Sequence, residues 1–334
     1  MVKLHHKYSI FRNLVNFIIK GRKGVSFDSG SRATPLLRQE TYPFDPLKDS
    51  GKDSSKYRKV IYICSPTQRS GTNFMCNTLR LHRDIAYPET PLLPNEHFLY
   101  SHADMLSDYL HKTIGYWPKW VNDKMSLTRM HSALLAGMGD GVLNEFYKAL
   151  ADPDKILMLR TPDAGNLEYF PAMFPGGKLV VIIRDGRDTV NSFVDSFSGD
   201  WAFGKMTKRW ADRTEYLLGL YEKMKSQGLE NRIQIFRYEE LNSQPEQTVR
   251  QILKFLRLEA SGYDWEKLNE IPVVGSSTQY NKKDGDEFWK PSEKVDSSSF
   301  TNKWKDWSPA KKRKFKKLAG KQLIMAGYST DLNW

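Results

Sequence analysis

Side chains able to bind an anion follow a short apolar run, Val60–Cys64, whose composition predicts a buried parallel strand. An apolar stripe with helical spacing begins at Thr72 or Asn73, just after Gly71 breaks the strand pattern. The intervening loop, SPTQRSGT, therefore leads into the N-terminus of a helix, where free N–H groups and the helix dipole attract anions. Arg69 adds a positive charge with two-pronged donor geometry, which suits a phosphate or sulfate group.

An arginine and a serine occupy a similar position later in the chain. Leu179–Ile183 predict another buried strand, and a turn then leads into a helix expected to start near Asp188. Arg184 would lie at the strand end and Ser192 about two turns into the helix, so that both side chains donate to one phosphate. The alternative is an ion pair between Arg184 and a structural carboxylate such as Asp185 or Asp188.

Both motifs resemble those of one enzyme family. The first loop lacks the initial glycine and the Gly-Lys pair of the nucleotide-triphosphatase loop G-x-x-x-x-G-K-[ST]. SPTQRSGTNF instead resembles the 5′-phosphosulfate loop, commonly written PRSGTT, of sulfotransferases that use 3′-phosphoadenosine 5′-phosphosulfate (PAPS). Gln68 replaces its proline and Asn73 its second threonine. RDGRDTVNS resembles the 3′-phosphate site of the same family, and RYEEL points to its bacterial-type and tyrosylprotein branches.

The resemblance covers roughly Tyr57 to Tyr328 and implies an α/β fold with a mostly parallel sheet flanked by helices, the P-loop-like sulfotransferase fold. The residue patterns agree, because further strands are predicted at Lys155–Leu159 and Ile233–Arg237, alternating with helices such as residues 203–227. Ligand loops are then expected at the carboxyl ends of the strands. A basic helix follows Ser308, and we interpret its KKRKFKK run as a solvated face.

The chain is predicted to contain one sulfotransferase domain, residues 56–334, after a basic N-terminal extension, residues 1–55. An aromatic-rich insertion at about 89–150 is expected to form a cap, with most aromatic residues in the cap's own core and some lining the acceptor pocket. The polar segment 276–303 is expected to be a lid loop. Within the extension, SIFRNLVNFIIKGRK either packs on the domain or lies on an anionic membrane surface.

The resemblance also implies which residues act in catalysis. In this family a base removes the acceptor proton during in-line attack on sulfur, cationic groups stabilise the departing phosphate oxygen, and no metal ion is required. Glu89, in HRDIAYPET, is the favoured base, and Glu96 with His97, in PNEHF, is the alternative. Arg69 and Arg160 are the cationic candidates, although the tyrosylprotein branch has a lysine at the second position.

The predicted co-substrate is PAPS, with no metal ion. By resemblance its contacts are Arg69, Ser70, Gly71, Thr72 and Asn73 in the first loop, Arg184 and Ser192 in the second motif, and Tyr238, Ser277 and Lys303 elsewhere. An additional arginine of the tyrosylprotein branch is Ser196 here, which predicts a looser grip on the 3′-phosphate.

Net charge and composition favour some classes of binding partner over others. Lysine and arginine number 51 against 39 acidic residues, a net charge of +12, which favours anionic ligands. No zinc finger, basic heptad or RNA-binding signature accompanies this charge, so nucleic acid is not an expected partner. Cys64 and Cys76 are interpreted as reduced packing residues. No signal peptide or membrane-spanning segment is evident, which predicts a cytoplasmic protein, with membrane association as an alternative.

Three functions were weighed. The first is sulfuryl transfer from PAPS to a hydroxyl or amine of a small-molecule, glycan or lipid acceptor. A nucleotide kinase-like P-loop enzyme is the second, and it would require the missing Gly-Lys pair and a carboxylate for magnesium. The third is a non-catalytic adenosine-phosphate binding protein, which would keep both phosphate motifs without turnover.

Overall fold

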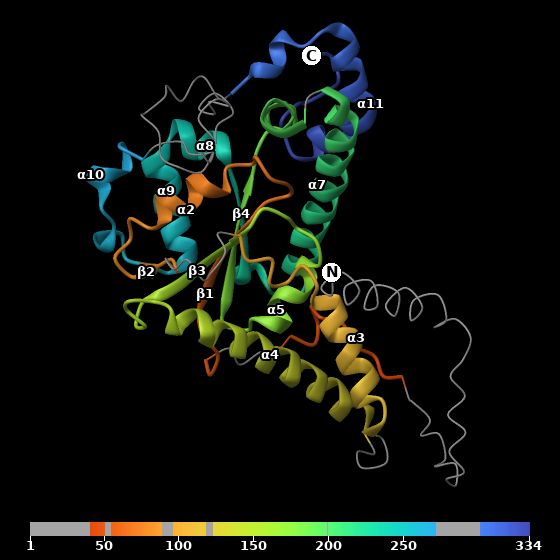
Figure 1. Ribbon diagram of the computed structural model, residues 1–334, viewed down its shortest axis with the longest axis vertical. Coiled ribbons are helices and arrows are strands. Elements are labelled where there is room, and N and C mark those ends of the chain that lie inside the picture. The colour runs from red at the N-terminus through yellow and green to blue at the C-terminus, as the bar shows by residue number, and fades with distance from the viewer. Residues whose placement is uncertain (1–40, 51–54, 89–95, 118–122, 199, 272–300) are drawn as a thin grey trace, which may run out of the picture. The chain divides into compact units, whose positions relative to one another are not determined.

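A parallel sheet of five strands organises the described part of the chain (Figure 1). The computed structural model describes residues 41–50, 55–88, 96–117, 123–198, 200–271 and 301–334. The strands are β1 (Val60–Cys64), β2 (Ile85–Ala86), β3 (Ile156–Thr161), β4 (Gly177–Ile183) and β5 (Ile233–Arg237). Their order is β2-β3-β1-β4-β5, and every neighbouring pair is parallel. The predicted α/β class with a mostly parallel sheet is confirmed.

Helices cover both faces of this sheet. They are α2 (Thr72–Leu79), α3 (Ala103–Ile114), α4 (Lys124–Lys148), α5 (Phe170–Met173), α6 (Gly186–Phe193), α7 (Phe203–Ser226), α8 (Tyr238–Ser243), α9 (Pro245–Leu256), α10 (Trp265–Leu268) and α11 (Pro309–Met325). Alternate residues of β1 point to opposite faces, because successive side chains of a strand alternate. Val60, Tyr62 and Cys64 pack with α3, α4, α5 and α7, whereas Ile61 and Ile63 pack with α2, α8, α9 and α10.

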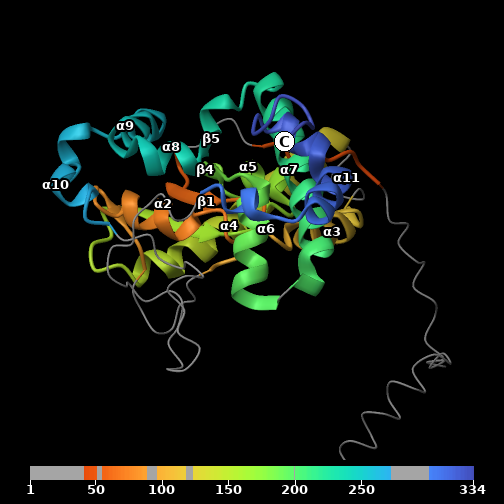
Figure 2. The same ribbon diagram turned by 90° about the horizontal axis from the view of Figure 1, so that it is seen from above.

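A third buried cluster joins α6, α7 and α11 beside the sheet. Trp210 and Phe315 are fully buried in it, and Trp304 and Trp307 pack against them from the segment before α11. Ser308 caps α11 by accepting from the Lys311 N–H, as the Ser-Pro pair predicts. In Figure 2, α7 and α11 lie at one end of the domain and α9 and α10 at the other. This cluster fixes α6, which carries part of the candidate site.

The segment predicted to form a cap contains two long helices. The helices α3 and α4 lie directly on one face of the sheet, where Tyr100, Leu110 and Leu143 belong to the main core cluster. Tyr109 and Tyr116 are not core residues of a cap, since 58% and 43% of their surfaces are exposed. The reason is that each amphipathic helix buries only the face that meets the sheet. The short strand β2 was also not predicted, because two residues are too few for a pattern.

The compact unit runs from Glu40 to Trp334. Tyr42 and Leu47, which lie in the predicted extension, are buried in the same cluster as α3 and α4, and the Thr128 hydroxyl donates to the Pro43 carbonyl. Residues 1–40, which contain the apolar segment with basic flanks, lie outside the described residues. Among the described helices, none has the length and apolar character needed to span a bilayer.

Both cysteines are packing residues. Cys64 and Cys76 are free thiols buried in the two core clusters, and burial raises the pKa of the Cys76 thiol to about 11. This confirms their interpretation as reduced side chains of the core.

Candidate functional site

The loop between β1 and α2 has the backbone shape of an anion-binding turn. Arg69 and Gly71 both have positive φ values, 71° and 96°. A Cβ atom on Gly71 would lie 2.4 Å from the Tyr238 ring, so glycine is needed for the space as well as for the backbone angle. No described side chain caps the N-terminus of α2, and its first N–H groups are therefore open to an anion.

The two sequence motifs meet at this loop. Arg69 Nε donates to Ser192 Oγ at 3.1 Å, and Arg184 Nη1 donates to the Arg69 carbonyl at 3.0 Å. Burial and the nearby Arg184 guanidinium together lower the pKa of Arg69 to about 10. An anion placed here would offset both effects, because it supplies the charge and the acceptors that burial removes. The fold thus brings Arg69 to Ser192 and Arg184 to the backbone of Arg69.

Nearby carboxylates are engaged in other contacts. Asp185, one alternative partner for Arg184, forms a buried ion pair with Arg187 at 2.6 Å. Asp188 Oδ2 accepts from the Asn302 backbone N–H at 2.8 Å, and burial raises the pKa of Asp188 although Arg184 acts to lower it. The Arg184 guanidinium lies 4.7 Å from the centre of the Tyr238 ring. Asp185 is therefore not the partner that holds Arg184 in place.

A second layer supports the turn that carries Arg184. Glu239 Oε1 accepts from the Asp185 N–H at 2.9 Å, and Tyr328 Oη lies 3.0 Å from Glu239 Oε2. Burial raises the pKa of Glu239. Because Tyr328 follows α11, the end of the chain braces the β4–α6 turn. RYEEL by itself indicates only a family resemblance, because this role depends on contacts between distant segments.

The other end of the loop contacts residues proposed for catalysis. Arg160, the penultimate residue of β3, donates from Nη1 to Asn73 Oδ1. Glu96 forms a side-chain hydrogen bond with Gln68 and lies close enough to Arg160 for that charge to lower its pKa, although burial raises the pKa more strongly. Gln68 and Asn73 are the two positions that depart from the PRSGTT pattern. Gln68 therefore contacts Glu96, and Asn73 contacts Arg160.

His97 is bonded to the backbone of Arg160 from both directions. The His97 N–H donates to the Arg160 carbonyl at 3.0 Å, and the Arg160 N–H donates to His97 Nδ1 at 3.1 Å. Nδ1 also lies 3.1 Å from the Arg160 carbonyl oxygen, so both of its possible partners belong to the backbone of Arg160. Burial lowers the pKa of His97 to about 4, and the ring is neutral at pH 7. His97 thus fixes the end of β3 and holds Arg160 at the loop.

The remaining predicted residues are placed as follows. The Ser70 hydroxyl donates to the Thr67 carbonyl at 2.8 Å, and the Ser196 hydroxyl donates to the Ser192 carbonyl at 2.7 Å. Asp188 also accepts from the Lys303 backbone, which brings Lys303 to α6. Glu89, Ser277 and most of the predicted lid lie outside the described residues.

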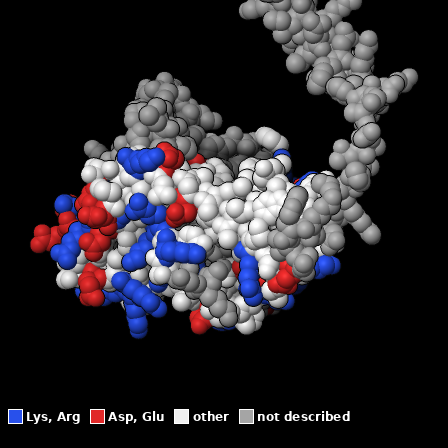
Figure 3. Space-filling view, turned by 90° about the horizontal axis from the view of Figure 1, so that it is seen from below, with Lys and Arg blue, Asp and Glu red and all other residues white. Residues whose placement is uncertain are grey.

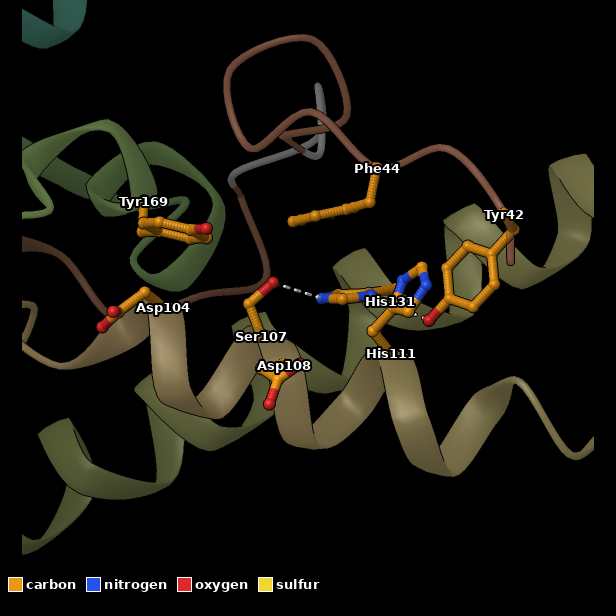
Figure 4. A pocket seen from close by; sticks show the side chains of 8 residues that line it. All are labelled: Tyr42, Phe44, Asp104, Ser107, Asp108, His111, His131 and Tyr169. Carbon is orange, nitrogen blue, oxygen red and sulfur yellow. Dashed lines mark hydrogen bonds between the residues drawn. The ribbon is translucent and has the colours of Figure 1, made fainter. Parts of the chain in front are cut away.

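A cavity of about 290 Å³ lies away from these residues, between α3, α4 and the 41–44 segment (Figure 4). Its lining is Tyr42, Phe44, Asp104, Ser107, Asp108, His111, His131 and Tyr169. His131 Nδ1 lies 2.9 Å from Tyr42 Oη, and Nε2 lies 3.0 Å from Ser107 Oγ. The Phe44 ring stacks on the imidazole at 3.8 Å. These contacts attach the 41–44 segment to the helices, and we assign no ligand to the cavity.

Comparison with known proteins identifies relatives of one kind. A model of the sulfotransferase family matches residues 62–262, which contain both strand-turn-helix motifs. The protein-tyrosine sulfotransferase of Drosophila melanogaster is 25% identical over 238 residues, 67% of this chain and 43% of that protein. The chain therefore spans less than half the length of that relative.

Solved structures of sulfotransferases are also similar to this chain. The sulfotransferase domain of the Synechococcus PCC 7002 olefin synthase is 15% identical, with a TM-score of 0.49, over 80% of this chain and 97% of that chain. Mouse sulfotransferase SULT7A1 complexed with PAP is 14% identical, with a TM-score of 0.47, over 85% of this chain and 92% of that chain.

Proposed function

Because the chain belongs to the sulfotransferase family, we propose that it transfers a sulfuryl group from PAPS to a hydroxyl or amine of an acceptor molecule. The observation that carries this proposal is the meeting of Arg69, Arg184 and Ser192, from two motifs far apart in the sequence. In this proposal the 5′-phosphosulfate occupies the loop at the N-terminus of α2, and Arg184 and Ser192 bind the 3′-phosphate.

The proposed reaction is an in-line displacement. A lone pair of the acceptor oxygen or nitrogen attacks sulfur, and the bond from sulfur to the bridging phosphate oxygen breaks. That oxygen leaves with the bonding electrons as part of 3′-phosphoadenosine 5′-phosphate (PAP), while a base takes the acceptor proton. In this proposal Arg69, Arg160 and the N–H groups of α2 stabilise the negative charge on the leaving oxygen; their contacts around the β1–α2 loop support this role. No metal ion is assigned a role.

Two carboxylates are proposed for the base. Glu89 is the first, on the strength of its motif. Glu96 is the second candidate, supported by its contacts with Gln68 and Arg160 and by a pKa that burial raises, which would make its carboxylate a stronger base. His97 is a positioning residue in this proposal, because Nδ1 and the backbone N–H of His97 both contact the backbone of Arg160.

Transfer of labelled sulfate tests the proposal directly. The protein is incubated with PAPS carrying labelled sulfate and with separate small-molecule, glycan and lipid fractions of a cell extract, and label is followed into each fraction. Label in a fraction identifies the acceptor class. Binding of PAP without transfer to any fraction would instead favour the non-catalytic adenosine-phosphate binding protein. Transfer of labelled phosphate from ATP would favour the kinase-like function.

A further inference from the structure

One tryptophan is left almost entirely in solvent. Trp201 is 80% exposed, the highest value among the large apolar side chains that the structure describes. It lies in the short helix η4 (Asp200–Ala202), between α6 and α7, in a stretch that projects from the sheet in Figure 2. An exposed indole leaves a large apolar surface in water, while its N–H favours a polar boundary. Such a side chain suits an interface between an apolar phase and water.

Basic side chains of α11 lie beside the residues that follow this tryptophan. The Phe203 ring, two positions further on, has Lys311 Nζ at 5.0 Å and Lys314 Nζ at 5.9 Å from its centre. A Cβ atom on Gly204 would lie 3.1 Å from Lys314 Cε. Lys205 is exposed in the first turn of α7. The start of α7, which directly follows the projecting stretch, therefore lies against the N-terminal half of α11.

The lysines assigned to the contact are not neutralised by carboxylates of the described residues. Residues 309–325 contain no acidic residue. Lys205, Lys314 and Lys317 make no ion pair with any carboxylate in the described ranges, whereas Lys321 at the far end of α11 pairs with Glu215 at 3.0 Å. Cations in the first turn of a helix also oppose its dipole. By contrast, Lys and Arg lie among Asp and Glu on the face seen in Figure 3.

We infer that Trp201, Lys205, Lys314 and Lys317 form a docking surface for an anionic lipid bilayer. The lysines supply charge complementarity to anionic headgroups, and the projecting indole supplies the apolar contact that a soluble polyanion does not need. The stretch that carries Trp201 begins directly after α6, which contains Ser192. Docking would thus bring the membrane beside the proposed donor site. The inference concerns binding alone and does not depend on the reaction.

Co-sedimentation with vesicles tests this inference on the full chain without PAPS. Vesicles of phosphatidylcholine are compared with vesicles in which roughly a third of the lipid is phosphatidylserine, since anionic lipid attracts exposed lysines. We expect binding only to the anionic vesicles, decreasing with added salt. Trp201→Ala should weaken it about tenfold, in line with a lost interfacial indole. The triple variant Lys205→Gln, Lys314→Gln, Lys317→Gln should weaken it further.

A control removes the same charge elsewhere. Lys112, Lys148 and Lys225 each pair with a carboxylate of their own helix, and their triple replacement by glutamine should leave vesicle binding unchanged. Three results would overturn the inference. These are no binding by the wild-type chain, binding unaffected by the Trp201 and lysine variants, and a loss in the lysine variant but not in Trp201→Ala. Binding unaffected by the variants would place the contact elsewhere, for example in residues 1–40. A loss in the lysine variant alone would indicate that the surface binds a soluble polyanion.

Discussion

Two arginine side chains lie close together at the proposed donor site, and their positions explain why a phosphate would bind there. Arg69 is largely buried, and Arg184 adds a second positive charge that helps to lower the pKa of Arg69. Holding like charges together costs free energy in the unbound protein, which a bound dianion would offset. Ser192 completes the group by accepting from Arg69. Ligand affinity and protein stability should therefore be linked at these residues.

This linkage predicts that PAP protects the protein against heat without magnesium. At about a hundred times its dissociation constant, a ligand raises the free energy of unfolding by roughly 2.7 kcal/mol. Arg184→Ala should lose most of this gain, while Arg250→Ala, which removes an arginine paired with Glu246 on the surface, should keep it. Thermal unfolding followed with and without PAP gives the result. An equal shift with a nucleotide that lacks the 3′-phosphate would contradict the assignment of Arg184.

The identity of the base is also a question of single residues. Glu89→Gln should slow transfer on the order of a hundredfold, the usual contribution of a positioned base, and leave PAP binding intact. Glu96→Gln should slow it less. Single-turnover rates for the two variants settle the ranking, and equilibrium binding of PAP serves as the control for folding. The opposite ranking would assign the base to Glu96, whose contacts with Gln68 and Arg160 already place it at the loop.

The β1–α2 turn joins the strand to the helix that faces the donor, and its geometry depends on one glycine. Gly71→Ala adds a Cβ atom 2.4 Å from the Tyr238 ring at a φ of +96°. We expect a loss of about 1–3 kcal/mol in the free energy of unfolding, the usual range for such backbone strain, together with weaker PAP binding. Urea unfolding measures the first effect and a PAP titration the second.

A glycine in α4 provides the matched control. Gly137 is exposed, and an added Cβ atom would meet nothing within 4 Å. Gly137→Ala should raise the free energy of unfolding by about 0.5–1 kcal/mol, because alanine loses less conformational freedom in a helix. We therefore expect Gly71→Ala to lower the free energy of unfolding and Gly137→Ala to raise it. A neutral result for Gly71→Ala would show that the turn tolerates a side chain and that its geometry is not required.

The stability of the whole domain should depend on pH through two buried histidines. Burial lowers the pKa of His97 and His131 to about 4, whereas the ordinary value is 6.5. Between these values the unfolded chain binds protons that the folded chain does not, so the free energy of unfolding falls as pH falls from about 6.5 to about 4. Above about pH 6.5 both histidines are neutral in the folded and in the unfolded chain, so protonation no longer lowers the free energy of unfolding. Buried carboxylates with raised pKa values, such as Glu239, act in the opposite direction.

The histidine contribution is isolated by comparing variants. The free energy of unfolding of the wild-type chain should fall between pH 7 and pH 4.5. In His131→Gln this fall should be smaller by roughly 1 kcal/mol or more, because the variant lacks the buried imidazole. His102→Gln, at an exposed position before α3, serves as the control for replacing a histidine by glutamine. Urea unfolding at the two pH values measures both. A parallel pH dependence in wild type and His131→Gln would contradict the buried, neutral state of His131.

The amino-acid sequence by itself determined the local parts of this protein. Continuous apolar runs identified β1, β3, β4 and β5 to within a few residues, and the helical face of Val249, Ile252 and Leu253 is buried as its spacing indicates. These features follow from the periods of strands and helices, which need only neighbouring residues. The two motifs predicted to bind anions are also local features, because each is a continuous strand-turn-helix segment.

Only the tertiary structure decided which of these parts meet. The strand order places β1 between β3 and β4, and this order brings Arg69 to Ser192 and Asn73 to Arg160 across long stretches of chain. The bonds that His97 makes to the backbone of Arg160 likewise depend on where the chain returns after β2. Strand order arises from how helices of many lengths pack together on both faces of the sheet, and no local pattern records that balance.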